Sequence, residues 1–282
     1  MIIYKIFEKI CNGFGLSPIF FRQIIRQFEK FIELPVEFLV KTNSTERPNY
    51  AYCLYHAAVL AKRLGHNSMS VIEFGVAGGN GLIFIEKFSK RIEKKLNLKI
   101  EIYGFDLGAG LNKPENYKDL MYWFKEGFYK MDIEKLKVKL KEAKLILGNV
   151  NNTIENFFEK YNPSPIGVIF HDLDYYYSTI NSFKIFDANE KYFLPRIFNY
   201  FDDIMGTEFE MYNNYSGELL AIEDFNKKND YKKIILNNNL IATNNEKWKS
   251  QIYYYHNFKH KDYNKYIGGH EQEFLNKHLA IK

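Results

Sequence analysis

The sequence predicts an α/β fold built on a doubly wound, mostly parallel sheet of seven strands, preceded by helices and ending in an antiparallel hairpin. Three observations predict this fold. Short apolar runs alternate with amphipathic segments from residue 69 onward, turns rich in glycine or aspartate follow several runs, and the last two runs have too short a link for a crossover helix. Strands that alternate with helices imply right-handed crossovers and a mainly parallel sheet.

Residues 1–65 are expected to form a helical prelude that covers the sheet or supplies a partner surface. Apolar residues recur at helical spacing over residues 17–40, with an interruption at Pro35. A second helical stretch, residues 50–65, ends at Gly65, a residue suited to the left-handed conformation that closes a helix. The repeating pattern of strands and helices starts only a few residues later.

The main domain is expected at residues 66–258, followed by a polar tail at residues 259–282. Its five parallel strands are predicted at residues 70–74, 100–106, 145–150, 167–174 and 196–203. The helices that follow the first four strands are predicted at residues 78–96, in two pieces within 115–143, at 153–161 and at 178–186. A helix at 217–228 then precedes the two strands of the antiparallel hairpin, residues 231–237 and 251–258.

The turn after the first strand carries a cluster of glycines, among them Gly75, Gly78 and Gly79. Glycine permits positive φ and lets a ligand approach the backbone closely, and the following helix N-terminus offers free N–H groups. The spacing G-x-x-G-G-x-G does not match the dinucleotide fingerprint G-x-G-x-x-G. With Glu73 two positions before the first glycine, the segment instead resembles motif I of class I methyltransferases.

That resemblance implies S-adenosylmethionine as the cofactor and adds residues after the next two strands. Asp106 ends the second strand, where a carboxylate can accept the ribose hydroxyls of a nucleotide in either cofactor class. Asn149 and Val150 end the third strand, at the place where methyltransferases of this class hold the adenine ring. These residues join Glu73 and the glycines as predicted cofactor contacts.

Four carboxylates, those of Asp172, Asp174, Asp202 and Asp203, follow the fourth and fifth strands. If these strands are neighbours in the sheet, the carboxylates converge at one rim and raise one another's pKa. A bound divalent cation removes this conflict, and oxygen ligands favour Mg²⁺, with Mn²⁺ or Ca²⁺ as substitutes. Such a metal can hold an alcohol hydroxyl and lower its pKa, while a carboxylate or a histidine takes the proton.

The pattern D-x-D-x-Y-x-S-T at residues 172–179, followed by a pair of aspartates, resembles the metal-dependent O-methyltransferases of the macrocin and aminocoumarin type. Those enzymes act on sugar hydroxyls of natural products, and the resemblance extends over residues 47 to about 256. It implies that Asp172, Asp202 and Asp203 ligate the metal and that Asp174 is the general base.

The sequence departs from that pattern at two positions. His171 precedes the first aspartate, and Tyr177 stands where related proteins often have an acidic residue. The base is therefore left open between Asp174 and His171.

Composition restricts the partners. The net charge of +5 is small, and the basic residues form no stripe of the kind that binds nucleic acid. The two cysteines, Cys11 and Cys53, form no motif, as expected for a cytoplasmic protein. No stretch is apolar enough to span a membrane, and charged residues interrupt the apolar N-terminus, unlike a signal peptide. The sequence does not decide whether the protein forms a homo-oligomer.

The leading hypothesis is an S-adenosylmethionine-dependent O-methyltransferase, with Mg²⁺ as its metal, that acts on a hydroxyl of a sugar, nucleotide-sugar or glycoconjugate. One alternative is a metal-independent methyltransferase of the same fold with His171 as base. Two others are a nicotinamide-dependent oxidoreductase and a non-catalytic binding protein.

Overall fold

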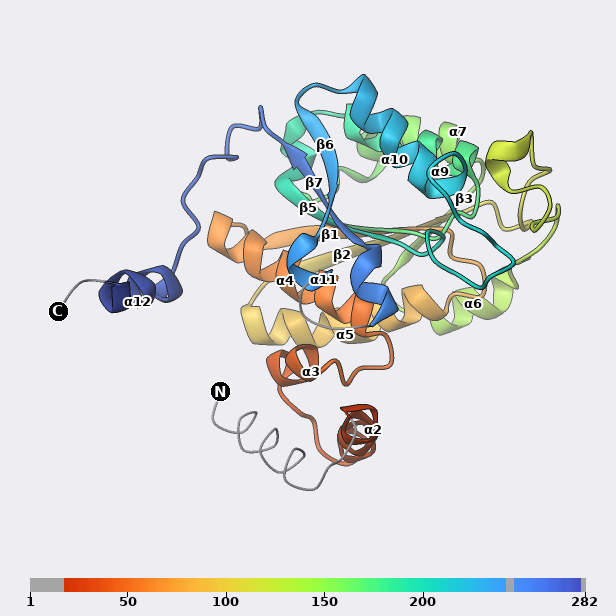
Figure 1. Cartoon of the computed structure of the whole chain (residues 1–282). Coiled ribbons are helices and arrows are strands. Elements are labelled where there is room, and N and C mark those ends of the chain that lie inside the picture. Colours follow the sequence, from red (N-terminus) through yellow and green to blue (C-terminus); the bar gives the residue numbers. More distant parts are fainter. Residues whose placement is uncertain (1–17, 242–245, 280–282) are drawn as a thin grey trace.

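The computed structural model describes residues 18–241 and 246–279 (Figure 1). Its centre is a seven-stranded sheet with the order β3-β2-β1-β4-β5-β7-β6. The pairs from β3 to β5 are parallel, whereas β7 lies between β5 and β6 and is antiparallel to both. The predicted doubly wound sheet and antiparallel C-terminal pair are therefore confirmed, and β6 forms one edge.

The strands lie where the apolar runs predicted them, with shifts of a few residues at their ends. Their bounds are β1 Ser68–Phe74, β2 Lys99–Asp106, β3 Lys144–Leu147, β4 Ile166–His171, β5 Phe193–Phe201, β6 Lys232–Leu236 and β7 Ile252–Asn257. The fourth and fifth strands end before their aspartates, and Asp174 has a φ of 57°, a left-handed conformation that cannot continue a strand. The acidic residues therefore belong to the loops beyond the sheet.

The α-helices cover both faces of the sheet, except α12, which lies apart from it (Figure 1). They are α2 Pro18–Glu29, α3 Val36–Thr42, α4 Pro48–Leu64, α5 Asn80–Leu96, α6 Ile133–Lys139, α7 Val150–Glu155, α8 Phe157–Tyr161, α9 Tyr176–Ser182, α10 Gly217–Lys228, α11 Asn238–Ile241 and α12 His270–Leu279. The 3₁₀ turns are η1 Tyr117–Asp119, η2 Phe183–Asp187, η3 Glu190–Tyr192 and η4 Lys247–Gln251. No helix within these described residues is long and apolar enough to cross a membrane.

Two hydrophobic cores result from the period-two alternation of the strands. On β1, Met69 and Val71 face the core shared with α4 and α5, whereas Ile72 and Phe74 face the core shared with α7 to α10. In the prelude, α4 begins at Pro48, a favourable first residue, and ends at Gly65 in the left-handed conformation. Because α4 packs on α5, β4 and β5, the prelude contributes directly to one face of the sheet.

Candidate active site

A cavity of about 490 Å³ opens at the carboxyl ends of the parallel strands, on both sides of the switch point between β1 and β4. This is the expected ligand position in an open α/β sheet, and the volume suits a cofactor-sized molecule. Eight of the residues predicted from the sequence line it, namely Gly75, Asp106, Asn149, Val150, Asp172, Asp174, Asp202 and Asp203. Four do not line it, namely Glu73, Gly78, Gly79 and His171.

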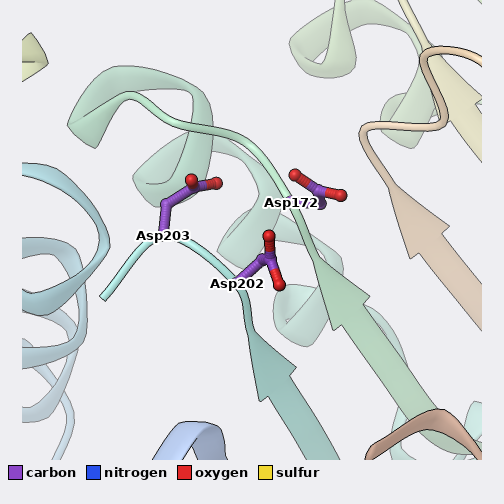
Figure 2. A group of neighbouring side chains, drawn as sticks. All are labelled: Asp172, Asp202 and Asp203. Carbon is purple, nitrogen blue, oxygen red and sulfur yellow. The ribbon is translucent and has the colours of Figure 1, made fainter. Parts of the chain in front are cut away.

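The side chains of Asp172, Asp202 and Asp203 converge at one end of the cavity (Figure 2). One carboxylate oxygen of each lies within 4.8 Å of one oxygen of the other two. The backbone explains this convergence, because the Asp172 amide bonds the carbonyl of Phe74 at 2.9 Å and the Asp202 amide bonds that of His171 at 2.9 Å. These two bonds extend the parallel pairing one residue beyond the strands, so the aspartates emerge side by side.

Asp203 is held by hydrogen bonds to residues of three segments. Its carboxylate accepts hydrogen bonds from the amide of Asp174 at 3.0 Å and from the hydroxyl of Tyr212 at 3.1 Å. Its own amide donates to Glu218 at the start of α10, over 3.0 Å. Nearby, the hydroxyl of Tyr200 donates to Asp202 over 2.5 Å. The acidic cluster is therefore held in place before any ligand arrives.

Burial and mutual repulsion raise the pKa values of these acids. Burial raises the pKa of Asp172 well above its usual range, and the charges of Asp203 and Asp202 add to the effect. Burial followed by repulsion from Asp202 raises the pKa of Asp203 to about 7. For Asp174, burial and then Asp203 and Asp202 raise the pKa to about 9.

These acids have almost no cationic neighbour. Among the described residues that line the cavity, Lys113 is the one cationic side chain. Closely spaced carboxylates without a counter-charge are unfavourable, and a donor set made only of carboxylate oxygens is the type that Mg²⁺ and Ca²⁺ prefer. The residues present therefore fit a hard divalent cation.

His171 packs inside the protein instead of facing the cavity. Its ring is fully buried and stacks on Phe201, with ring centroids 4.4 Å apart. Its Nε2 lies 3.2 Å from Oδ1 of Asn199, and its Nδ1 lies 3.3 Å from Oγ of Ser182. Burial lowers the pKa of His171 to about 3, so the ring is neutral. This geometry gives no support to the alternative in which His171 is the base.

At the other end of the cavity, Asp106 holds the glycine loop. Its Oδ2 accepts the amides of Val76 at 2.8 Å and Ala77 at 2.9 Å, and its Oδ1 accepts the amide of Gly108 at 2.5 Å. An ionised carboxylate has about four acceptor sites. Three bonds to the backbone therefore leave Asp106 room for about one further hydrogen bond, such as one from a ribose hydroxyl.

The glycines of this loop allow close packing beneath the cavity. Gly75 has a φ of 82°, and a Cβ there would overlap the backbone oxygen of Asp172. Gly79, with a φ of 79°, precedes α5, and a Cβ there would overlap the side chain of Leu136. Gly78 meets nothing within 4 Å at its Cβ position. Gly75 thus lets the backbone of the glycine loop pack directly against that of Asp172.

Glu73 lies beneath the glycine loop, on the side of the sheet that α4 covers. Tyr50 of α4 donates a hydrogen bond to its Oε1 over 2.8 Å, and a Cβ on Gly81 would overlap the same oxygen. Burial raises the pKa of Glu73 to about 8, although the bond from Tyr50 and the charge of Arg47 lower it. Glu73 therefore contacts α4 and α5, which support the glycine loop, and not the cavity.

We expect ionisation of Glu73 to lower the free energy of unfolding as the pH rises from about 4.5 to about 8. Its pKa rises from 4.5 to about 8 in the folded protein, which therefore binds more protons than the unfolded chain in this window. The stabilisation is complete below pH 4.5 and is lost as the pH approaches 8, at roughly 1.4 kcal/mol per unit of pKa separation. Denaturant titrations of wild type and Glu73→Gln at several pH values measure this loss. If the free energies of unfolding of the two proteins depended on pH in the same way, the raised pKa of Glu73 would be contradicted.

Comparison with known proteins identifies the fold. No protein-family model matches the chain, and no curated protein matches it in sequence. Among solved structures, the calicheamicin methyltransferase CalS11 is 18% identical with a TM-score of 0.50, over 83% of this chain and 90% of that one. The O-methyltransferase NovP is 12% identical with a TM-score of 0.51, over 75% and 81%. The chain has the class I methyltransferase fold. At these identities the likeness concerns the fold alone.

In this methyltransferase fold, several cavity residues come from loops and were not predicted from the sequence. Asp119, Tyr129 and Glu210 line the cavity. Asp119 is 1% exposed, and its carboxylate accepts the amides of Glu115 at 2.9 Å and Tyr177 at 3.2 Å, so it ties a loop to α9. The sequence predicted two helical pieces within residues 115–143, and the structure has the 3₁₀ turn η1 and the helix α6 there. That helical pattern did not indicate that Asp119 and Tyr129 reach the cavity, and no local signal indicated Glu210.

Proposed function

We propose that the protein is an S-adenosylmethionine-dependent, Mg²⁺-dependent O-methyltransferase that acts on a hydroxyl of a sugar, nucleotide-sugar or glycoconjugate. The observation that carries the proposal is one cavity with two different ends. The glycine loop and Asp106 form one end, and Asp172, Asp202 and Asp203 form the other. Two of the solved structures of similar fold are a calicheamicin methyltransferase and an O-methyltransferase, which agrees with this chemistry.

At the cofactor end, S-adenosylmethionine would supply the methyl group as an electrophile. The side chain of Asp106 would accept a ribose hydroxyl with its remaining acceptor site. Asn149 and Val150 line the cavity where α7 begins and would contact the adenine. The backbone at Gly75 would lie along the remainder of the cofactor, because no side chain intervenes there.

At the acidic end, Asp172, Asp202 and Asp203 would hold the Mg²⁺ ion, which when bound would orient the acceptor hydroxyl and lower its pKa. Asp174 would take the hydroxyl proton as the new oxygen–carbon bond forms. S-adenosylmethionine, when bound, would supply the methyl group and leave as S-adenosylhomocysteine with the electrons of the carbon–sulfur bond on sulfur, so that the product would be a methyl ether. Without an ion, burial raises the pKa of Asp174 to about 9 and favours its protonated form. The positive charge of Mg²⁺ beside it would favour the ionised form that a proton acceptor needs.

Titration of S-adenosylhomocysteine into the protein by calorimetry, with and without Mg²⁺, tests the cofactor assignment. We expect binding in both conditions, because Asp106 and the acidic cluster lie at different ends of the cavity. NAD⁺, titrated in parallel, is expected not to bind, since the G-x-G-x-x-G spacing is absent. Binding of NAD⁺ without S-adenosylhomocysteine would favour the oxidoreductase, and binding of neither would overturn the methyltransferase.

Removal of divalent ions tests the metal assignment. With an accepting saccharide in hand, EDTA is expected to abolish methyl transfer and added Mg²⁺ to restore it. Unchanged activity in EDTA would instead favour a metal-independent methyltransferase. Because S-adenosylhomocysteine binding is measured separately, the two tests distinguish failure of the metal from failure of the cofactor.

A further inference from the structure

A second hollow, of about 390 Å³, lies on the protein surface beside the cavity. Two loop segments form it, residues 111–131 and residues 205–216. Its lining consists of Tyr117, Met121, Tyr122, Asn213, Tyr215 and Ser216. None of the residues in the proposed mechanism belongs to this set.

The hollow and the cavity are lined by residues of the same two segments. Asp119, which lines the cavity, lies between Tyr117 and Met121, which line the hollow. The hydroxyl of Tyr122 donates to the backbone oxygen of Glu210, another cavity residue, over 2.6 Å. A small buried core behind them contains Leu120, Phe124 and Tyr175, and Tyr175 also lines the cavity. The hollow and part of the cavity are therefore built from the same two segments of the chain.

The hollow is aromatic and uncharged. Its tyrosines are unusually open to solvent, with Tyr215 77% exposed, Tyr117 69% and Tyr122 62%. All six lining residues are neutral, although 26% of the chain is charged. Such a gathering of exposed large side chains commonly marks a binding surface. Aromatic faces suit an uncharged ligand with an apolar flat side, and tyrosine hydroxyls add hydrogen bonds.

Ser216, which lines the hollow, carries a buried hydroxyl without a partner in the described part of the chain. The residue is 6% exposed, and none of the described residues provides a hydrogen-bond partner for its Oγ. It precedes α10, yet its side chain makes no capping bond to that helix. A buried hydroxyl without a partner is costly, so a ligand that bonds it would relieve this cost.

We propose that the hollow binds a neutral sugar ring of the acceptor, remote from the hydroxyl that is methylated. Aromatic rings would stack on the apolar C–H face of the sugar, and Ser216 would bond one of its hydroxyls. The acceptor would then contain at least two sugar rings, as an oligosaccharide or glycoconjugate. A nucleotide-sugar fits less well, because its diphosphate would find no cation in the hollow. The inference rests on the proposed function, whose acceptor it specifies.

The test uses direct binding, so it does not depend on turnover. Saturation-transfer NMR and titration would compare the neutral trisaccharides maltotriose, cellotriose and chitotriose with the acidic trigalacturonate. We expect at least one neutral trisaccharide, and not the acidic one, to bind wild type. Tyr215→Ala and Ser216→Ala should each weaken this binding about fivefold, which corresponds to about 1 kcal/mol for a lost stacking contact or hydrogen bond. Tyr266→Ala, which removes a tyrosine 75% exposed outside the hollow, is the matched control.

Failure of all three neutral trisaccharides to bind, or binding that both variants leave unchanged, would overturn the proposal. A change of oligomeric state in Tyr215→Ala, seen by sedimentation, would instead assign the hollow to a second copy of the chain and also overturn it. The same samples are titrated with S-adenosylhomocysteine, whose affinity the variants should not alter. If trisaccharides bind but S-adenosylhomocysteine does not, the proposed function fails while the sugar site stands.

Discussion

Asparagine in place of Asp202 is expected to abolish Mg²⁺ binding and to lower methyl transfer at least about a hundredfold, since a metal contributes several kcal/mol to such a step. The substitution removes one of three converging carboxylates with little change of volume. The amide oxygen can still accept the bond from Tyr200 that holds the side chain. S-adenosylhomocysteine should bind the variant within about threefold of wild type, because its site is at the other end of the cavity.

Calorimetry with Mg²⁺, and separately with S-adenosylhomocysteine, checks both parts of this expectation. Asp230→Asn removes an exposed carboxylate outside the cavity and serves as the control. Undiminished Mg²⁺ binding by Asp202→Asn would show that the cluster is not the metal site. A loss of S-adenosylhomocysteine binding in that variant would show that the two ends of the cavity are not independent.

When no divalent ion is present, Asp202→Asn should make the protein more stable, although it removes Mg²⁺ binding. Repulsion from Asp202 raises the pKa values of Asp172 and Asp203, and asparagine removes it. The ion-free variant is therefore expected to melt at a higher temperature than the ion-free wild type above pH 7. Added Mg²⁺ should stabilise wild type and leave the variant unchanged, because a ligand stabilises only the state that binds it.

The sequence predicted the layers of the fold because each layer leaves a local pattern. On β1, Met69 and Val71 alternate with Ile72 and Phe74 between two helical layers, and this alternation follows from the geometry of a strand. Gly65 closes α4 for an equally local reason, since its φ of 92° is costly for other residues. The order of the strands has no such pattern, so the place of β7 between β5 and β6 emerged only from the structure.

The predicted site depended on two facts that local pattern does not contain. Convergence of Asp172 with Asp202 and Asp203 requires β4 and β5 to be neighbours, and they are. Whether a side chain at the end of a strand reaches the cavity depends on which helix or strand packs against that side of the sheet. For this reason the sequence could not reveal that Glu73 faces Tyr50 and that His171 stacks on Phe201, away from the cavity.

The loops were the least predictable part of the site. Asp119 lies in η1, within a stretch where the sequence predicted helical pieces, and Glu210 and Ser216 lie in the irregular segment between β5 and α10. Tyr129 has a φ of 61°, a conformation that is uncommon outside glycine. Long-range packing decides which of these side chains reach the cavity, so a single sequence carries no signal for them.

Alanine in place of Asp106 is expected to weaken S-adenosylhomocysteine binding at least about thirtyfold, or roughly 2 kcal/mol, and to leave Mg²⁺ binding intact. The substitution removes both the acceptor for the ribose and the anchor of the Val76 and Ala77 amides. Asp132→Ala removes a similar carboxylate, which caps α6 away from the cavity, so it should cost about 1 kcal/mol of stability without changing either affinity. Calorimetry with both ligands separates Asp106→Ala from Asp202→Asn. The two variants must lose opposite ligands, because a shared loss would mean that the cavity is one undivided site and that the proposed division of labour between its ends is wrong.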